Sequence, residues 1–340
     1  MTTVLDPSAF SDLIDLASER VGGTALAAND EFFAPKENLL KTSRPVFRED
    51  EYTDRGKWMD GWETRRRREP GHDWCVVRLG LPGEIRGVVV DTRHFVGNAP
   101  EACAIEACEA AGDPRAAALE GTVWFEILPK ILLAPDFENA FPALAGRRAT
   151  HVRLHIFPDG GVARLRLFGA AIPDWERLGR QGEIDLAAAE NGGLVVAASD
   201  MHFGNRHNLV FPGPPRSMRD GWETRRRRGP GHDWAIVRLG AEGVVRRIVL
   251  DTSYFKGNAP GEASIEGIRA PETSVDDLAL ASAPWREILP RTALRPDAVR
   301  ELRGEVRDVG AVTHVRLNIF PDGGVARLRL FGEPARRPSG

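Results

Sequence analysis

The chain has 340 residues and a net charge of −3, and 42% of its residues are hydrophobic while 28% are charged. This composition is typical of a soluble globular protein, and a prior of about 150 residues per domain predicts about two domains. The near-neutral charge argues against nucleic acid as a partner. Because no run of about 18 apolar residues occurs, we expect no membrane span and no membrane partner.

The N-terminus and the cysteines bear on the cellular compartment. The first residues, MTTVLDPSAFSDL, include acids and lack the basic and apolar segments of a secretory signal. The three cysteines, Cys75, Cys103 and Cys108, form no C-x-x-C pair, so neither a disulfide framework nor a zinc site is expected. We therefore expect a cytoplasmic protein.

The first predicted element is a helix near the N-terminus. Asp6 can cap it, and Pro7 suits its first position. Gly22-Gly23 would end it. One predicted apolar face carries Phe10, Leu13, Ile14 and Ala17.

Short β-strands dominate the sequence that follows. The segments HDWCVVRLG (72–80) and EIRGVVVDT (84–92) are predicted to form an antiparallel hairpin that turns at Leu81-Pro82-Gly83. Further strands are predicted at 102–108, 151–157 and 162–169, where β-branched or alternating residues are bounded by turn residues. Many short strands in one domain-sized unit predict a β-sandwich or jelly roll.

The same motifs occur twice. DGWETRRRR at 60–68 recurs at 220–228, PGHDW at 70–74 recurs at 230–234, and IFPDGGVARLRLFG at 156–169 recurs at 319–332. The period is the size of a domain, so the chain is predicted to be one domain used twice. The predicted boundaries are 10–169 for the first repeat, 170–183 for a linker, 184–333 for the second repeat and 334–340 for a tail.

These motifs resemble two groups of proteins. Their order within each repeat resembles the galactose-binding-like jelly roll. The longer motifs are similar to those of the allantoicase family: A-S-D-x-x-F at 198–203, D-G-W-E-T-R-R-R-R, G-H-D-W, D-T-x-x-F-K-G-N-x-P and F-P-D-G-G-V-A-R-L-R. The resemblance covers nearly residues 10–333.

The resemblance implies a fold and an activity. The expected fold is all-β, with two tandem jelly-roll β-sandwich domains and short flanking helices. The expected enzyme is a hydrolase of C–N bonds in linear amidines that converts allantoate to ureidoglycolate and urea in purine breakdown. A homo-oligomer is also implied. No cofactor is expected, and no metal ligand is assigned because the sequence lacks a spacing such as H-E-x-x-H.

The predicted hairpin suggests where the chemistry lies. It would bring the start of its first strand and the end of its second to one end of the sandwich. A histidine with its adjacent aspartate could supply the general base and acid, and so could two carboxylates such as Glu223 and Asp251; the sequence does not rank them. The candidate catalytic residues are His72, Asp73 and Asp91 in the first repeat and Glu223, His232, Asp233 and Asp251 in the second.

Substrate-binding candidates follow from the substrate that the resemblance implies. Arginine can hold the carboxylate of allantoate bidentately, and Asp and Asn can pair with its ureido groups. On a strand, however, Arg65 and Arg67 would face away from Arg66 and Arg68, so one face could instead pair structural acids. The candidates are Asp30, Arg65, Arg67 and Asn98 in the first repeat and Asp200, Arg225, Arg227, Lys256 and Asn258 in the second.

Several motif residues also have a purely structural interpretation. The tryptophans of both motifs (Trp62, Trp74, Trp222 and Trp234) are expected to anchor the core. His72 and His232 could order loops through hydrogen bonds. Asp159 and Asp322 suit turns, and Asn98 and Asn258 could adopt a left-handed conformation.

The repeats differ at polar positions. Lys256 is matched by Val96, His207 by Glu37 and Asn318 by His155. We therefore expect the second repeat, which also has the Ser199-Asp200 form, to carry the more complete site. Two other functions stay open: a tandem non-catalytic carbohydrate- or ligand-binding module, and an enzyme acting on a neighbouring ureide.

Overall fold

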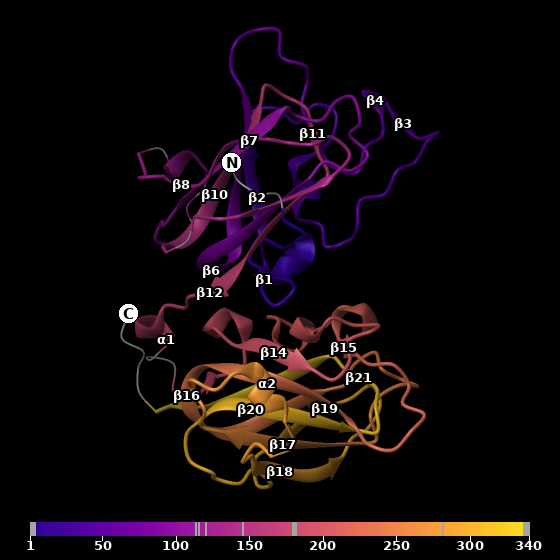
Figure 1. The fold of residues 1–340 in the computed structure, drawn as a ribbon, viewed down its shortest axis with the longest axis vertical. Coiled ribbons are helices and arrows are strands. Elements are labelled where there is room, and N and C mark those ends of the chain that lie inside the picture. Colours follow the sequence, from indigo (N-terminus) through magenta and orange to yellow (C-terminus); the bar gives the residue numbers. More distant parts are fainter. Residues whose placement is uncertain are drawn as a thin grey trace. The chain divides into compact units, whose positions relative to one another are not determined.

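The chain folds into two compact units, Met1–Ile172 and Pro173–Gly340, in a computed structural model (Figure 1). The structure describes residues 5–112, 114, 116–119, 121–144, 146–178, 182–280 and 282–335. Each unit is a β-sandwich, and the two units, here the first and second domains, are described separately. The all-β fold class predicted from the sequence is confirmed. No helix among the described residues is long and apolar enough to cross a membrane.

The first domain is built on one long strand, β6 (Asp73–Asp91), which belongs to both layers of the sandwich. Its first half pairs with β2 and β10, and its second half pairs with β9 and β12. The other strands are β1 (Ile14–Asp15), β2 (Thr24–Ala28), β7 (Ala102–Cys108), β8 (Phe125–Leu132), β9 (Glu138–Pro142), β10 (Arg148–Phe157) and β12 (Arg164–Ala171).

The predicted hairpin at Leu81-Pro82-Gly83 is wrong. The two segments are halves of β6 and do not pair with each other; the pairing with β10 shifts register near this point. Even so, Asp73 pairs with Ile156 of β10 and Asp91 pairs with Arg164 of β12. Because only residues 158–163 connect β10 to β12, both ends of β6 lie at the same end of the sandwich.

The second domain repeats this plan. Its long strand β16 (Asp233–Asp251) pairs with β14 and β20 in its first half and with β19 and β22 in its second. The other strands of the sheet are β13 (Ile184–Asp185), β14 (Leu194–Ala198), β17 (Glu262–Ile268), β18 (Arg286–Ala293), β19 (Val299–Leu302), β20 (Val312–Phe320) and β22 (Arg327–Pro334).

Small sheets and short helices complete the domains. β5 (Trp62–Glu63) pairs with β11 (Gly161–Val162), and β15 (Trp222–Glu223) pairs with β21 (Gly324–Val325). A hairpin of β3 (Tyr52–Thr53) and β4 (Gly56–Lys57) occurs in the first domain. The helices of four residues or more are η1 (Pro7–Phe10), η3 (Lys36–Leu40), η4 (Ala116–Leu119), η6 (Arg206–Val210), α1 (Trp175–Leu178) and α2 (Val275–Ala279).

The predicted N-terminal helix is only partly correct. Asp6 caps it by accepting a hydrogen bond from the Ser8 amide at 2.8 Å. The helix ends at Phe10, however, because Ile14 and Asp15 pair with β12 as a strand. Pairing with the sheet satisfies backbone groups that a longer isolated helix would have to satisfy alone.

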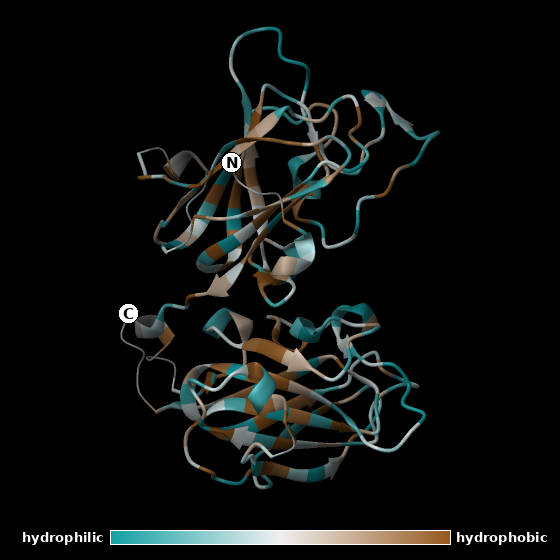
Figure 2. Ribbon diagram, viewed as in Figure 1, coloured by the Kyte–Doolittle hydropathy of each residue, from teal (hydrophilic) through white to brown (hydrophobic). Residues whose placement is uncertain are grey.

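Hydrophobic and hydrophilic residues follow one another along the strands of each domain (Figure 2). Trp62 and Trp222 are fully buried, as expected of core anchors. Trp74 and Trp234 are half-buried and pack against the edges of apolar clusters formed by Val76, Cys108 and Leu119 and by Ile236, Ile268 and Leu278. Both pairs of tryptophans therefore contribute to packing.

A buried arginine organises the end of each sandwich. Arg164, at the start of β12, is 1% exposed and forms an ion pair with Asp60 at 2.6 Å. Its guanidinium also donates to the Ser43 and Asp60 carbonyls at 3.0 and 2.7 Å. In the second domain Arg327 donates to the Gly213 and Asp220 carbonyls at 3.1 and 2.7 Å. Each arginine thus fixes the segment that leads into the DGWETRRRR motif.

Replacing Arg164 by methionine is expected to destabilise the first domain by about 3 kcal/mol, because the buried Asp60 carboxylate loses its buried charged partner and keeps only the half-exposed Lys41 at 3.3 Å and the Val46 amide. Calorimetric unfolding of the full chain measures the effect. The control is Arg86→Met, which removes an exposed ion pair with Glu84 and should cost about 1 kcal/mol or less. Equal losses in the two variants would contradict this role of Arg164.

The second domain is expected to lose stability in acid through His314 of β20. Burial, and the nearby Arg238 to a lesser degree, lower the pKa of His314 from 6.5 to about 4. The folded state therefore binds this proton less readily than the unfolded chain, so stability falls as the pH drops from about 6.5 towards 4. His314→Gln should flatten the dependence of the unfolding temperature on pH in this window. An unchanged dependence would assign the acid sensitivity to other groups.

Candidate functional site

The arginine run of the first domain lies in a loop and not in a strand. β5 ends at Glu63, and residues 64–68 have irregular backbone. The Thr64 amide donates to the Gly160 carbonyl at 3.2 Å, and the Arg67 amide donates to Asp159 Oδ2 at 2.8 Å. Asp159 therefore holds this arginine loop in place, and Asp322 holds the corresponding loop at the Arg227 amide.

This loop forms one wall of a cleft of about 480 Å³. The predicted division of the arginines between two faces is wrong, because an irregular backbone need not alternate its side chains and all four border this cleft. Four predicted site residues of the first repeat meet here. The residues that line the cleft are Asn29, Asp30, Arg65, Arg66, Arg67, Arg68, Glu69 and Asp73.

Asp73 is the buried carboxylate of the cleft, with an exposed fraction of 1%. Its Oδ1 accepts from Arg67 at 2.7 Å and from Asn29 Nδ2 at 2.8 Å. Among the described residues no donor reaches its Oδ2, and no acceptor reaches Nε of Arg67. Both atoms are buried from solvent and lack, among these residues, the partners that buried polar groups ordinarily have.

Asp30 is the second carboxylate of the cleft. Its ion pair with Arg65 measures 2.6 Å. Burial alone would raise the pKa of Asp30, but hydrogen bonds from the Phe32 and Arg65 amides and from the Arg65 guanidinium outweigh burial and lower it. Asp30 therefore stays ionised and orients Arg65, and it is unsuited to donate a proton.

The second domain repeats both carboxylate–arginine pairs. Asp200 pairs with Arg225 at 3.1 Å. Burial alone would raise the pKa of Asp200, but hydrogen bonds from the Arg225 and His202 amides outweigh burial and lower it. Arg227 donates to Asp233 Oδ1, which also accepts from Ser199 Oγ at 3.0 Å. Ser199 thus takes the place of Asn29, and the predicted residues Asp200, Arg225, Arg227 and Asp233 form a matching set.

His72 does not pair with the adjacent Asp73, which corrects one of the two predicted acid–base arrangements. Its Nε2 lies 2.9 Å from Nδ1 of His155, and Nε2 of His155 lies 3.0 Å from Oε2 of Glu106. Consecutive strand residues point to opposite faces, so the side chains of His72 and Asp73 diverge. His232 likewise contacts Asn318 at 3.2 Å.

A glutamate–asparagine pair lies beside each arginine loop. Asn98 donates to Glu63 at 2.7 Å, and Asn258 donates to Glu223 at 2.5 Å. Burial raises the pKa of Glu63, against a lowering by the Asn98 amide. Neither asparagine has the left-handed backbone that was considered for it; His94 and Tyr254 have it instead, with φ of 71° and 72°.

The aspartates that end the long strands are held apart from the cleft residues. Asp91 pairs with Arg93 at 2.6 Å, and Arg93 also reaches Glu138 at 3.0 Å. Asp251 accepts from the Ser253 amide at 2.7 Å. Lys256 is exposed and lies 3.8 Å from Asp297. The contacts given by the structure place none of Asp91, Asp251 or Lys256 in hydrogen-bond contact with the predicted cleft residues.

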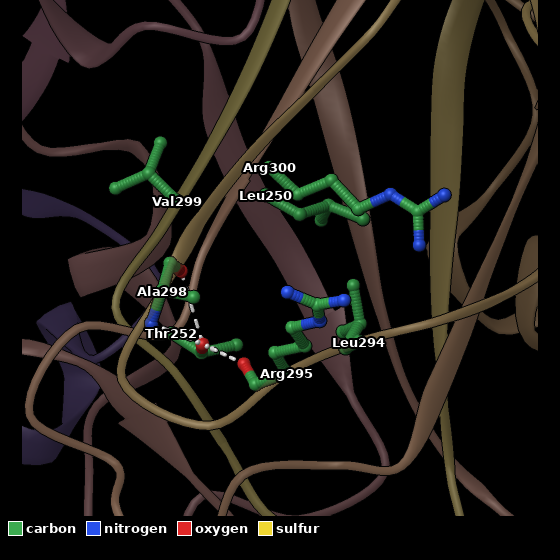
Figure 3. Close-up of a pocket in the computed structure, with 7 residues that line it drawn as sticks. All are labelled: Leu250, Thr252, Leu294, Arg295, Ala298, Val299 and Arg300. Atoms are coloured by element: carbon green, nitrogen blue, oxygen red, sulfur yellow. Dashed lines mark hydrogen bonds between the residues drawn. The ribbon is translucent and has the colours of Figure 1, made fainter.

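A separate pocket of about 400 Å³ lies beside β16 and β19 in the second domain (Figure 3). Thr252 donates to the Arg295 and Ala298 carbonyls at 2.7 and 3.0 Å. Arg295 and Arg300 contribute charge to this pocket. It contains none of the predicted site residues.

Several residues of these sites were not predicted as candidates: Asn29, Glu63, Arg66, Arg68, Glu69, Glu106 and His155. Asn29 and Glu63 flank predicted residues, and Glu63 could have been found because its counterpart Glu223 stands in the same repeated motif. Glu106 gave no motif signal, because only strand pairing brings it to His155. Within the described residues no group of three or more His, Cys, Asp or Glu side chains could hold a metal ion.

Comparisons with known proteins agree with the repeated architecture. The family model described as the allantoicase repeat matches residues 14–172 and 184–335. Probable allantoicases of Photobacterium profundum and Pseudomonas aeruginosa are each 47% identical, over 95% and 96% of this chain and 97% of either relative. The crystal structure of allantoicase from Saccharomyces cerevisiae is 32% identical, with a TM-score of 0.80 over 98% of this chain and 100% of that one. The chain therefore belongs to the allantoicase family.

Proposed function

We propose that the chain hydrolyses allantoate to ureidoglycolate and urea, in the first domain at the cleft of Asp73 and in the second at the matching residues around Asp233. The observation that carries the assignment of the site is the lining of the first cleft, where Arg65, Arg66, Arg67 and Arg68 lie beside the carboxylates of Asp30 and Asp73. A ureido group has a carbonyl acceptor and N–H donors side by side. It therefore complements an N–H donor next to a carboxylate acceptor.

The remaining arginines suit the carboxylate of the substrate. Arg66 and Arg68 border the cleft and are exposed, and Arg65 is held from one side by Asp30. A guanidinium presents two parallel N–H groups to a carboxylate, which binds and orients a planar anion. Allantoate has one carboxylate and two ureido groups, so the first cleft offers complementary groups for both.

The reaction breaks one C–N bond and forms one C–O bond. The oxygen of water attaches to the central carbon, and the nitrogen of the departing urea takes a proton. A base near the water and an acid near the leaving nitrogen accelerate such a step. Glu63 suits the role of the general acid, because its raised pKa keeps its carboxyl group protonated up to a higher pH. Glu223 is its counterpart in the second domain, where it likewise accepts a hydrogen bond from an asparagine.

We further propose a cytoplasmic homo-oligomer. The three cysteines are free and buried, which fits a reducing compartment. The subunit assembly is inferred from the family resemblance and is checked by light scattering of the purified protein.

Replacing both cleft aspartates, in the double variant Asp73→Asn and Asp233→Asn, is expected to lower kcat/KM for urea release from allantoate by about 10²-fold or more. Asparagine keeps the shape but removes the charge that holds Arg67 and Arg227 and that accepts from the ureido group. Urea is quantified by a coupled assay, and folding is checked by circular dichroism. Glu84→Gln, at an exposed pair with Arg86, is the control.

A double variant with wild-type kcat/KM would exclude these clefts as the site. A wild-type protein that binds allantoate or a carbohydrate but releases no urea would favour the non-catalytic binding module instead.

A further inference from the structure

The pocket of about 400 Å³ beside β16 and β19 of the second domain, here the arginine pocket, combines apolar walls with two arginines (Figure 3). Its apolar lining includes Leu250, which is fully buried, and Leu294, which is 8% exposed. Arg295 and Arg300 lie beside these leucines. A cavity of this size, with hydrophobic walls and a few polar groups, is typical of a site for a small molecule.

Thr252 supports the loop that borders the pocket. Its hydroxyl donates to the Arg295 and Ala298 carbonyls at 2.7 and 3.0 Å and accepts from the Ala298 amide at 3.1 Å. A hydroxyl has a single hydrogen to donate, and the two carbonyls share it. The side-chain donors that remain for a ligand in the described lining are therefore those of Arg295 and Arg300.

The two guanidinium groups have few acceptors of their own. Nη1 of Arg300 donates to the Ala293 carbonyl, and its Nη2 lies 3.9 Å from the exposed Glu305. Within the part of the chain that the structure describes, no acceptor lies within hydrogen-bond or ion-pair distance of the Arg295 guanidinium. Most of the donors of both arginines are thus available to a ligand.

The acids that lie nearest in sequence have other partners. Asp297 accepts from the Tyr254 amide at 2.7 Å. Glu301 pairs with Arg303 at 3.0 Å. The residues described as lining the pocket include no acid. The lining therefore carries positive charge that the protein compensates only in part.

The corresponding place in the first domain is filled by an asparagine. Asn139 and Arg300 have the same register position, opposite the second-last residue of β6 and of β16. Asn139 is 1% exposed. Its Oδ1 accepts from the Ala134 amide at 2.8 Å, and its Nδ2 donates to the Ala134 and Phe137 carbonyls at 3.0 and 3.2 Å. The asparagine side chain therefore closes the loop against the strand.

Three replacements between the repeats distinguish the arginine pocket from this closed loop. Arg300 stands in place of Asn139, Arg295 in place of Ala134 and Ala298 in place of Phe137. Two of them add a guanidinium, and the third replaces a ring by a methyl group. The loop keeps its shape, because Thr92 and Thr252 donate to the carbonyls at the same two positions. The fold does not require the three residues, and their common effect is a positively charged space.

We propose that the arginine pocket binds a small carboxylate that carries a short aliphatic chain. A guanidinium presents parallel N–H groups that match the two oxygens of a carboxylate. The aliphatic chain lies on Leu250 and Leu294, where its apolar surface is removed from water. The positive charge of the lining also attracts the anion from solution.

The chemistry of the arginine pocket differs from that of the first cleft. A ureido group offers N–H donors, which need acceptors. The cleft supplies the carboxylates of Asp30 and Asp73, whereas the described lining of the arginine pocket has no carboxylate or amide side chain. Inorganic phosphate would use the arginines but would leave the leucines without an apolar partner. The expected ligand is therefore neither allantoate nor phosphate, and its binding can be tested without an assay of urea release.

Titration of the full-length chain with butyrate tests the proposal. Butyrate has a carboxylate on a propyl chain. Butyramide has the same shape without the charge, and inorganic phosphate has the charge without the chain. Isothermal titration calorimetry compares the three affinities, and saturation-transfer difference NMR reports contact of the butyrate methyl group with the protein.

Variants locate the binding. Arg295→Ala combined with Arg300→Asn installs the residues of the first domain, and Ala298→Phe fills the pocket without changing its charge. Arg303→Ala is the matched control, because Arg303 is an exposed arginine just after β19 that is not among the described lining residues. Arg66→Ala combined with Arg68→Ala removes exposed arginines of the first cleft. Circular dichroism checks that each variant is folded.

Butyrate is expected to bind the wild type and to lose about 10-fold or more in affinity when Arg295→Ala and Arg300→Asn are combined, because charge-assisted hydrogen bonds are lost. Ala298→Phe should weaken binding to a similar degree by occupying the space. Butyramide and phosphate should bind the wild type less tightly than butyrate. Arg303→Ala and the combined Arg66→Ala and Arg68→Ala variant should keep the wild-type affinity.

Several results would overturn the proposal. Wild-type affinity in the combined Arg295→Ala and Arg300→Asn variant would exclude the arginine pocket, and a loss confined to the Arg66→Ala and Arg68→Ala variant would assign the binding to the first cleft. Equal affinities for butyrate and butyramide would exclude recognition of the carboxylate. Phosphate binding tighter than butyrate would indicate an inorganic anion instead, and absence of butyrate binding to the wild type would contradict the proposal directly.

Discussion

The candidate site depends on one buried charge in each domain. Arg164 and Arg327 lie at the start of the last long strand, and their guanidinium groups bind backbone carbonyls of the segments that precede the arginine loops. A guanidinium removed from water must use most of its five donors inside the protein. Because the guanidinium donates to backbone carbonyls, it fixes the position of a segment that has no regular secondary structure. The exposed arginines can therefore face a ligand because a buried arginine of the other repeated motif, IFPDGGVARLRLFG, holds the segment that precedes their loop.

The sequence was sufficient to predict the duplicated all-β fold and four of the residues that line the first cleft, Asp30, Arg65, Arg67 and Asp73. The repeat is visible in the sequence, and alternation along strands follows from burial of one face. The predicted hairpin failed because an alternating pattern interrupted by Pro82-Gly83 suits a turn and a bent strand equally well. Which of the two forms depends on partners far along the chain, here β10 and β12. The prediction that both strand ends lie at one end of the sandwich is nevertheless correct. The chain reverses its direction near Pro82-Gly83 in a bent strand as it would in a hairpin.

The finer arrangement of the site could not be predicted for a related reason. The adjacent His72 and Asp73 suggested an acid–base pair, but adjacent residues of an extended chain diverge, and each finds partners on other segments. His155 and Glu106 lie 49 residues apart in sequence and meet through the register of β10 with β7. The pairing of Asp73 with Asn29 similarly joins segments 44 residues apart. Strand register is set by the whole sheet, so no local motif reveals these contacts.

Duplication gives each domain the same loops but does not require the same chemistry. The two domains share buried carboxylate–arginine pairs, Asp73 with Arg67 and Asp233 with Arg227. Losing one partner would leave the other charge buried and unpaired, so both domains need these pairs for folding. The fold constrains His155 and Asn318 less strictly. Each can accept a hydrogen bond from a neighbouring histidine, His72 or His232, and donate one to a glutamate. Either residue satisfies the fold, and only one can change its protonation state. The positions where the repeats diverge without structural cost are therefore the positions at which their functions can separate.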